Sequence, residues 1–304
     1  MKKILIIKHG SLGDIALSLP AFYSIRNNYP QSEIYLLTEE KFINFFKKSK
    51  LINYFISNNR NESYLKTFKT LLDLVKINFE LIIDLQNSER TSVYNLFFRV
   101  FHKAKICSSR SFAHYRYKIP QQGKESIITG LFNQLKLIGI NHVNKIDYDW
   151  LKIDLKEKYN EPLVLFIPGV SKGNEYKQWQ PEKFLELAKY FEKNGFSICI
   201  IGTKNDIDSA KPILDNCSNI INKIDKSPPE VIYSIAKESQ LIISNDTGPG
   251  HLASLSNTKI IWIGNEDRIS RSNIVNDDFS NKILSKKVKN IEVKQVINLV
   301  EKLI

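Results

Sequence analysis

Cysteine is scarce in this chain of 304 residues, which holds only Cys107, Cys199 and Cys217 and no CxxC spacing. An odd number of cysteines without that spacing argues against a disulfide framework and against a zinc site. The histidines other than His251 show no HxxxH or HExxH pattern. The sequence therefore indicates no metal ligand set and no metal cofactor.

Long hydrophobic runs are missing as well. No apolar stretch approaches the roughly 18–20 residues that a membrane span needs. The N-terminus has a basic start followed by Ile4–Ile7, but this stretch is too short for a signal peptide and Lys8 interrupts it. We interpret it as a buried first strand and expect a cytoplasmic protein.

Several common nucleotide and hydrolase motifs are absent. There is no GxxxxGK[ST] phosphate loop and no GxSxG nucleophile elbow. The glycines at 10 and 13 lack the count and spacing of the GxGxxG dinucleotide fingerprint. P-loop, serine-hydrolase and NAD-type chemistries are therefore unsupported.

Positive charge is abundant and unevenly placed. Residues 1–150 hold 22 Lys and Arg against 12 Asp and Glu, whereas residues 151–304 hold 22 against 20. A run of eight basic residues without an acid comprises Arg90, Arg99, Lys103, Lys105, Arg110, Arg116, Lys118 and Lys124. This asymmetry favours an anionic partner, either a phosphorylated glycolipid, an anionic membrane or nucleic acid. A merely solvated basic surface is the alternative, and the lack of nucleic-acid-binding motifs disfavours nucleic acid.

Short apolar runs alternate with helical patterns along the whole chain. Seven runs rich in Ile, Leu and Val predict buried parallel strands: Lys3–Ile7, Glu33–Thr38, Leu81–Asp84, Leu163–Ile167, Phe196–Ile201, Leu241–Ser244 and Lys259–Ile263. The alternation restarts after the polar stretch Lys152–Pro162. This pattern predicts two doubly wound α/β domains, residues 1–155 and 160–304, with ligands at the carboxyl ends of the strands.

The first candidate motif, Lys8–Asp14, lies between the first strand and a helix. Its glycines allow close backbone approach to a ligand, and the helix offers free N–H groups. Asp14 has two interpretations. It is either an N-cap of the helix or a carboxylate that takes a proton from a hydroxyl.

Two further motifs follow strands of the second domain. Pro168–Pro181 contains Ser171 and Lys177 ahead of a helix, which suits a phosphate site, whereas Trp179 is interpreted as a packing anchor. Ser244–His251 is a glycine-rich segment at a helix start, where N–H groups can hold a pyrophosphate.

At these three motifs together the chain resembles the family 9 glycosyltransferases, which include the lipopolysaccharide heptosyltransferases. The resemblance rests on KHGSLGDIALSLPAFYSIRNNYP, on the DLQ segment from Asp84 followed by Arg90, on PGVS…YKQWQPEKF and on SNDTGPGHLAS. It extends in consistent order from residue 1 to about residue 265.

The resemblance implies a GT-B fold, in which two Rossmann-like domains face a central cleft. It implies a metal-independent, inverting transfer with Asp14 as general base, beside Ser11 and Gly13 on the acceptor side. The donor-binding residues that it implies are Ser171, Lys177, Asp206, Asp246, Thr247, Gly248 and His251. Arg110, Arg116 and Lys118 are our candidates for acceptor contact, because they belong to the basic run.

The expected substrates are a nucleotide sugar, ADP-heptose, and an anionic glycolipid of the lipopolysaccharide core. The resemblance and the charge together predict a monomer that contacts the cytoplasmic face of the inner membrane and needs no cofactor. Two alternatives stay open, a family 9 transferase with another nucleotide-hexose donor and a GT-B-like nucleotide-sugar epimerase.

Overall fold

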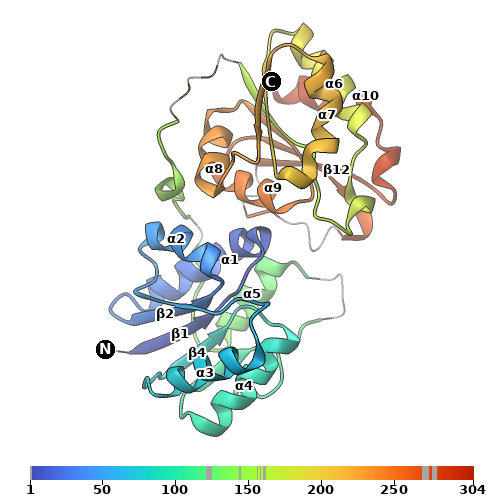
Figure 1. Cartoon of the computed structure of the whole chain (residues 1–304). Coiled ribbons are helices and arrows are strands. Elements are labelled where there is room, and N and C mark those ends of the chain that lie inside the picture. The colour runs from blue at the N-terminus through green and yellow to red at the C-terminus, as the bar shows by residue number, and fades with distance from the viewer. Residues whose placement is uncertain are drawn as a thin grey trace. The chain divides into compact units, whose positions relative to one another are not determined.

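A computed structural model describes residues 2–120, 125–143, 145–155, 157, 159, 162–268, 274–275 and 279–304. Contacts divide the chain into an N-terminal unit, Met1–Asp147, and a C-terminal unit, Tyr148–Ile304 (Figure 1). No helix in the described part of the chain is long and apolar enough to cross a bilayer.

The N-terminal unit is built on a parallel sheet of six strands in the order β3-β2-β1-β4-β5-β6. The strands are β1 Lys3–Ile7, β2 Glu33–Thr38, β3 Tyr54–Ser57, β4 Leu81–Asp84, β5 Lys105–Ser108 and β6 Tyr115–Arg116. Ile4–Ile7 of β1 are fully buried between β2 and β4. A continuous apolar run suits such a central parallel strand, since helices cover both of its faces.

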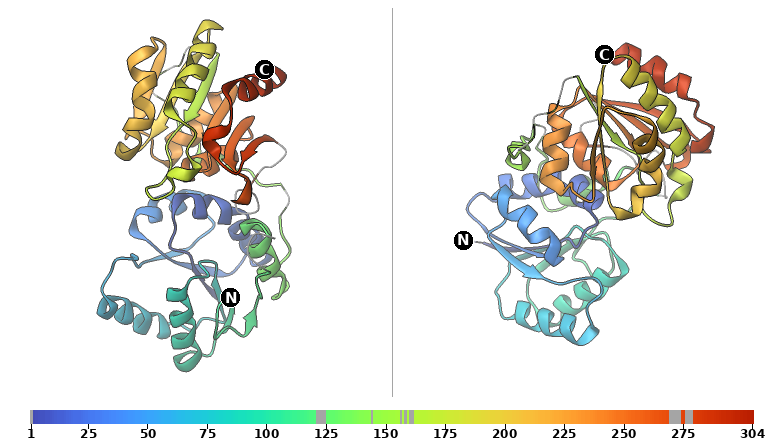
Figure 2. Two further views of the ribbon diagram at one scale, coloured as in Figure 1. Left: turned by 90° about the vertical axis from the view of Figure 1, so that its right-hand side faces the viewer. Right: turned by 45° about the horizontal axis from the view of Figure 1, so that its top comes forward.

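Four α-helices connect the first five of these strands, namely α1 Leu12–Asn28, α2 Glu40–Ser49, α3 Tyr64–Val75 and α4 Glu89–Phe101. The helix α5 Ile127–Lys136 follows β6. α3 and α4 contact each other, and α5 packs against α1. Right-handed crossovers place α1 and α2 on one face of the sheet and α3 and α4 on the other (Figure 2). Leu71 and Leu74 of α3 and Phe98 of α4 pack on the second face.

The C-terminal unit repeats the same topology. Its parallel sheet has the order β12-β11-β10-β7-β8-β9, with β7 Leu163–Ile167, β8 Ser197–Gly202, β9 Ile220–Ile224, β10 Leu241–Asn245, β11 Ile260–Asn265 and β12 Ser280–Ser285. The helices are α6 Pro181–Lys193, α7 Ile207–Asn216, α8 Pro229–Glu238, α9 Gly248–Ala253 and α10 Val293–Leu303. In both units the first strand is central. The second and third strands are added on one side of it, and the fourth to sixth strands are added on the other side, so the strand order reverses between the first and fourth strands.

The predicted α/β fold with two doubly wound parallel sheets is confirmed, and all seven predicted strands are present within one or two residues. Five strands were not predicted, namely β3, β5, β6, β9 and β12. These strands lie toward the edges, and β3 and β12 have no fully buried residue. Partly exposed strands have mixed composition, so their apolar signal is weak.

The boundary between the two units lies between Asp147 and Tyr148, ahead of the polar stretch Lys152–Pro162 that the sequence indicated. Tyr148 and Leu151 are buried, and the Tyr233 hydroxyl of α8 donates to Asp149 Oδ1 at 2.7 Å. Ile153 N also donates to Ser234 Oγ at 2.9 Å. These contacts place residues 148–153 with the C-terminal unit.

Candidate functional site

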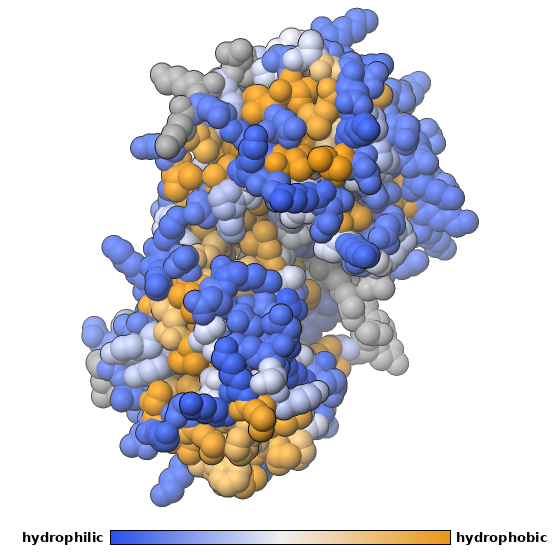
Figure 3. All heavy atoms as spheres, in the orientation of Figure 1, coloured by the Kyte–Doolittle hydropathy of each residue, from blue (hydrophilic) through white to orange (hydrophobic). Residues whose placement is uncertain are grey.

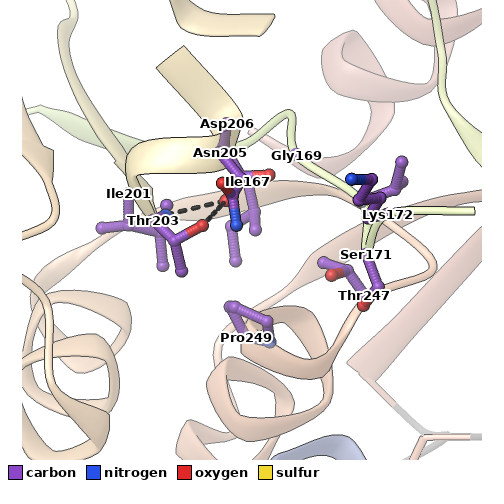
Figure 4. A pocket seen from close by; sticks show the side chains of 12 residues that line it. Ile167, Gly169, Ser171, Lys172, Ile201, Thr203, Asn205, Asp206, Thr247 and Pro249 are labelled. Carbon is purple, nitrogen blue, oxygen red and sulfur yellow. Dashed lines mark hydrogen bonds between the residues drawn. The ribbon is translucent and has the colours of Figure 1, made fainter. Parts of the chain in front are cut away.

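A cavity of about 270 Å³ opens at the carboxyl end of the C-terminal sheet (Figure 4). It lies beyond β7 and its neighbours β8 and β10, where the strand order reverses and open α/β sheets bind their ligands. Its lining residues are Ile167, Gly169, Val170, Ser171, Lys172, Ile201, Gly202, Thr203, Asn205, Asp206, Thr247 and Pro249. Three residues expected at the donor site, Ser171, Asp206 and Thr247, therefore share one cavity.

Asp206 and Thr203 lie at one end of this cavity (Figure 4). Asp206 Oδ2 accepts hydrogen bonds from Thr203 N at 2.7 Å and from Thr203 Oγ1 at 2.8 Å. A Cβ at Gly169 would lie 2.1 Å from Asp206 Oδ1, so a glycine is needed where the β7 loop passes this carboxylate. The arrangement presents an acidic acceptor group, which suits hydroxyl donors.

Ser171, Lys172 and Thr247 occupy the other end of the cavity (Figure 4). Thr247 is the N-cap residue of α9, and Ser171 and Lys172 are exposed on the β7 loop. Hydroxyls, a lysine and the first N–H groups of a helix suit an anion. Lys172 was missed by our sequence reasoning, although it directly follows Ser171.

Lys177, Asp246 and His251 form a charged cluster next to Thr247. Lys177 Nζ lies 2.7 Å from Asp246 Oδ2, and His251 Nε2 lies 3.4 Å from Asp246 Oδ1. Burial opposes ionisation of Asp246, but its hydrogen bonds with His251 and Lys177 prevail and hold its pKa well below the usual range. The ring of His251 also packs 4.8 Å from that of Trp262. Asp246 is therefore a buried anion that holds Lys177 and His251 in place.

Asn245 and Trp179 form the scaffold behind this cluster. The Asn245 side chain accepts from Trp179 N at 3.1 Å and donates to Pro168 O at 2.7 Å, which ties β10 to the β7 loop. Trp179 is fully buried and donates from Nε1 to Ile291 O at 2.8 Å. This confirms its interpretation as a packing anchor, whereas Asn245 was not singled out from the sequence.

In the N-terminal unit, the loop after β1 is held by a side chain that follows β4. Gln86 Oε1 accepts from His9 N at 3.0 Å and from Gly10 N at 3.4 Å. Gly10 has φ +121°, and a Cβ there would lie 2.1 Å from the ring of Phe42. The DLQ segment thus shapes the loop that leads to Asp14.

Asp14 is the third helical residue of α1, and Ser11 is the N-cap residue. The interpretation of Asp14 as the N-cap is therefore corrected. Its Oδ2 accepts from Ser11 N and Ser11 Oγ, both at 3.2 Å, in a reciprocal capping arrangement. Asp14 is half-buried, Ser11 is exposed and Gly13 is buried. Asp14 can therefore stabilise the start of α1 and still present its carboxylate to a substrate.

Lys8 is buried beneath this loop and donates from Nζ to Leu85 O at 3.2 Å. Burial lowers its pKa, while the nearby charges of Asp14 and Asp84 act in the opposite direction. Asp84 is itself fully buried and accepts from Gln86 N and Asn87 N at 3.0 and 2.9 Å.

A buried polar network lies behind the same loop. His9 Nε2 is 3.0 Å from Asn58 Oδ1, which also accepts from the Tyr94 hydroxyl at 2.9 Å. Burial is the main cause that lowers the pKa of His9 to about 4, so the ring is neutral at pH 7. Arg90 joins this network through the Thr67 hydroxyl at 2.9 Å and through Tyr94.

The basic run does not form one uniform exposed surface. Arg90 is half-buried in the network described above. Arg110 donates to Asn87 O at 2.7 Å and pairs with Glu89 at 2.5 Å. Arg116 and Lys118 are exposed on and after β6, and Lys124 lies outside the described residues. Within the described parts of the chain, no group of three or more His, Cys, Asp or Glu residues is placed to hold a metal ion.

Comparisons with known proteins agree with the fold. The model of glycosyltransferase family 9 (heptosyltransferase) matches residues 68–263. A curated relative, lipopolysaccharide heptosyltransferase 1 of Campylobacter coli, is 25% identical over 284 residues, with 86% of this chain and 83% of the relative covered.

Solved structures show the same fold. A family 9 glycosyl transferase from Veillonella parvula superposes with a TM-score of 0.81 at 18% identity, covering 99% of this chain and 97% of the other. The E. coli heptosyltransferase WaaC, solved with ADP, gives a TM-score of 0.79 at 16% identity, covering 99% of this chain and 100% of the other.

Proposed function

Because this chain belongs to glycosyltransferase family 9, we propose that it transfers a heptose from ADP-heptose to the lipopolysaccharide core or a related envelope glycolipid. The curated relative that aligns over most of its length is named a lipopolysaccharide heptosyltransferase. The predicted class of enzyme, a glycosyltransferase, is confirmed by the family match.

The observation that carries the proposal is the polarity of the cavity in the C-terminal unit. One end offers the Asp206 carboxylate, and the other offers Ser171, Lys172 and Thr247 (Figure 4). A nucleoside diphosphate has matching ends, because its ribose hydroxyls donate hydrogen bonds and its phosphates accept them. We place the ribose at Asp206 and the diphosphate toward Thr247 and Gly248.

The reaction is a single displacement with inversion at the anomeric carbon. Asp14 takes the proton of the acceptor hydroxyl, whose oxygen forms the new glycosidic bond. The bond between the anomeric carbon and the diphosphate oxygen breaks, and the negative charge grows on the leaving diphosphate. Lys177 and His251, positioned by Asp246, are the groups that stabilise this charge without a metal ion.

On the acceptor side we propose an anionic glycolipid at the cytoplasmic face of the inner membrane. The support is the excess of basic residues in the N-terminal half, with Arg116 and Lys118 exposed. Arg110 is part of the same candidate set, but its guanidinium is already engaged by Glu89. We propose a cytoplasmic monomer that binds no nucleic acid and needs no cofactor.

Calorimetry with ADP-, UDP- and GDP-heptose and the corresponding hexoses tests the donor. Binding of the ADP-heptose alone in the low micromolar range supports the proposal, and EDTA should leave both binding and turnover unchanged. Tighter binding of another nucleotide or of a hexose donor would show that ADP-heptose is not the donor. A rate that requires a divalent cation would contradict the metal-free mechanism.

A further inference from the structure

The outer surfaces of α3 and α4 are unusually apolar. Large apolar side chains scattered singly on a surface need no explanation, but a contiguous group does. On α3 the side chains of Tyr64, Leu65, Phe68 and Leu72 are exposed, with exposed fractions of 95% and 83% for the first two. Leu65, Phe68 and Leu72 recur at helical spacing, so they share one side of the helix, whereas Leu71 of the same helix is buried.

A second exposed apolar stripe runs along α4. Val93, Leu96 and Val100 have the same spacing, and Phe101 is exposed beside them. The two stripes are joined by aromatic contacts. The ring of Phe97 lies 5.6 Å from that of Phe68 on α3 and 4.9 Å from that of Phe101.

These two stripes form one surface, which we call the α3–α4 apolar face. Figure 3 shows it as hydrophobic atoms gathered where α3 and α4 lie in Figure 1. Both helices begin at the carboxyl end of the sheet, because α3 follows β3 and α4 follows β4. The face therefore starts at the same end of the N-terminal unit as the loop that carries Asp14.

Exposed basic side chains are frequent in the segment that forms this apolar face, and Lys66, Lys69 and Arg99 lie on α3 and α4 themselves. From α3 to the start of β5 the exposed basic residues are Lys66, Lys69, Lys76, Arg99, Lys103 and Lys105. The exposed acids in the same stretch are Asp73, Glu80 and Glu89, and two of these already pair with Lys76 and Arg110. An apolar surface together with basic side chains matches the interface of an anionic bilayer. Pairing of this face with the same face of a second copy would bring basic side chains close to one another, and their repulsion disfavours such a dimer.

We propose that the α3–α4 apolar face inserts into the headgroup region of an anionic membrane and holds the N-terminal unit on the leaflet that carries the acceptor. This inference rests on the proposed lipid-borne acceptor, and it assigns the docking to a surface separate from Arg110, Arg116 and Lys118. Each basic residue near the leaflet raises partitioning by about five-fold, and the apolar side chains add a part that salt does not screen.

Sedimentation of the full chain with vesicles tests this surface without any nucleotide. Vesicles of phosphatidylglycerol and phosphatidylethanolamine should bind the protein, and vesicles of phosphatidylcholine should bind it weakly. Leu65→Ser combined with Leu72→Ser should lower the partition coefficient about ten-fold or more. The matched control is Leu137→Ser with Ile304→Ser, two exposed side chains outside α3 and α4, which should leave binding unchanged.

Insertion depth provides a second readout. A Leu65→Trp variant should be quenched by brominated lipids, whereas Leu137→Trp should not. Undiminished vesicle binding of the Leu65→Ser, Leu72→Ser variant, equal binding to neutral and anionic vesicles, or no quenching would each overturn the proposal. Self-association that the same variant abolishes, without vesicle binding, would assign the face to a second copy instead.

The failure of this inference is distinguishable from failure of the proposed function. Turnover of a soluble, delipidated acceptor should be the same in the wild type and in the Leu65→Ser, Leu72→Ser variant. If the wild type binds vesicles through this face but neither binds ADP-heptose nor turns over the soluble acceptor, the proposed function fails and the docking surface stands.

Discussion

Replacement of Lys177 by methionine is the perturbation that best separates a structural role from a donor-binding role. Lys177 Nζ lies 2.7 Å from Asp246 Oδ2, and the two side chains are 19% and 6% exposed. The variant leaves Asp246 as a buried carboxylate that has lost its ion pair with lysine. We expect a loss of about 1–3 kcal/mol in the free energy of unfolding. This is less than the roughly 3–5 kcal/mol for a fully buried pair, because Lys177 is partly exposed.

The donor phosphates would lose a charge-assisted contact as well. Such a contact contributes about 1.5–3 kcal/mol, which corresponds to a drop of about 10- to 150-fold in affinity for ADP. Calorimetric titration with ADP measures this drop, and thermal unfolding of the same samples measures the stability.

The double variant Lys177→Met, Asp246→Asn decides between the two roles. The amide removes the uncompensated charge, so we expect the stability to return toward that of the wild type. Affinity for ADP should stay low, because no cation replaces Lys177 at the phosphates. If affinity is unchanged in the single variant, or is restored together with stability in the double variant, Lys177 serves only to neutralise Asp246 and our reasoning is refuted.

Three further variants test other parts of the site. Asp14→Asn should keep the cap and the melting temperature but lower turnover by about 10²–10⁴-fold at unchanged donor affinity, and near-normal turnover per folded molecule would leave Asp14 as a cap alone. Gly169→Ala should displace Asp206 and break its two hydrogen bonds with Thr203. Calorimetry should then show ADP affinity weakened by about ten-fold or more. An unchanged affinity would show that Asp206 does not bind the donor. The pKa of His9 is about 4 in the folded protein and 6.5 in the unfolded chain. Between these pH values the unfolded chain binds a proton at His9 and the folded protein does not. The free energy of unfolding should therefore fall by on the order of 3 kcal/mol as the pH drops through this window. Thermal unfolding from pH 7 to 4.5 should show a shallower decline in His9→Gln, and identical slopes would argue against a neutral buried ring.

The central parts of both sheets are readable from the sequence for a simple reason. β1 and β7 are buried on both faces, so nearly every position must be apolar, and the runs Lys3–Ile7 and Leu163–Ile167 stand out at once. The edge strands β3 and β12 face partly outward and mix polar with apolar residues, which removes that signal.

The site is partly readable for a related reason. The motifs around Ser171 and Thr247 follow the predicted strands β7 and β10, and parallel strands bring their carboxyl ends to one edge of the C-terminal sheet. Asp14 follows the predicted strand β1 at the same end of the other sheet. Sequence reasoning did not find Asn245, Lys172 or the role of Gln86. A short polar residue next to a strand has many possible partners, and its sequence neighbours do not indicate which one it contacts.

By itself the sequence determined the two doubly wound domains, because these depend on local patterns of apolar residues. Its motifs also resemble family 9, and the candidate loops follow predicted strands. Only the tertiary structure decided which charges pair and which apolar side chains stay exposed. Lys177 and Asp246 are 69 positions apart, and their pairing depends on how β7 and β10 lie side by side. Leu71 is buried and Leu65 is exposed on the same helix, because burial depends on which side of α3 meets the sheet.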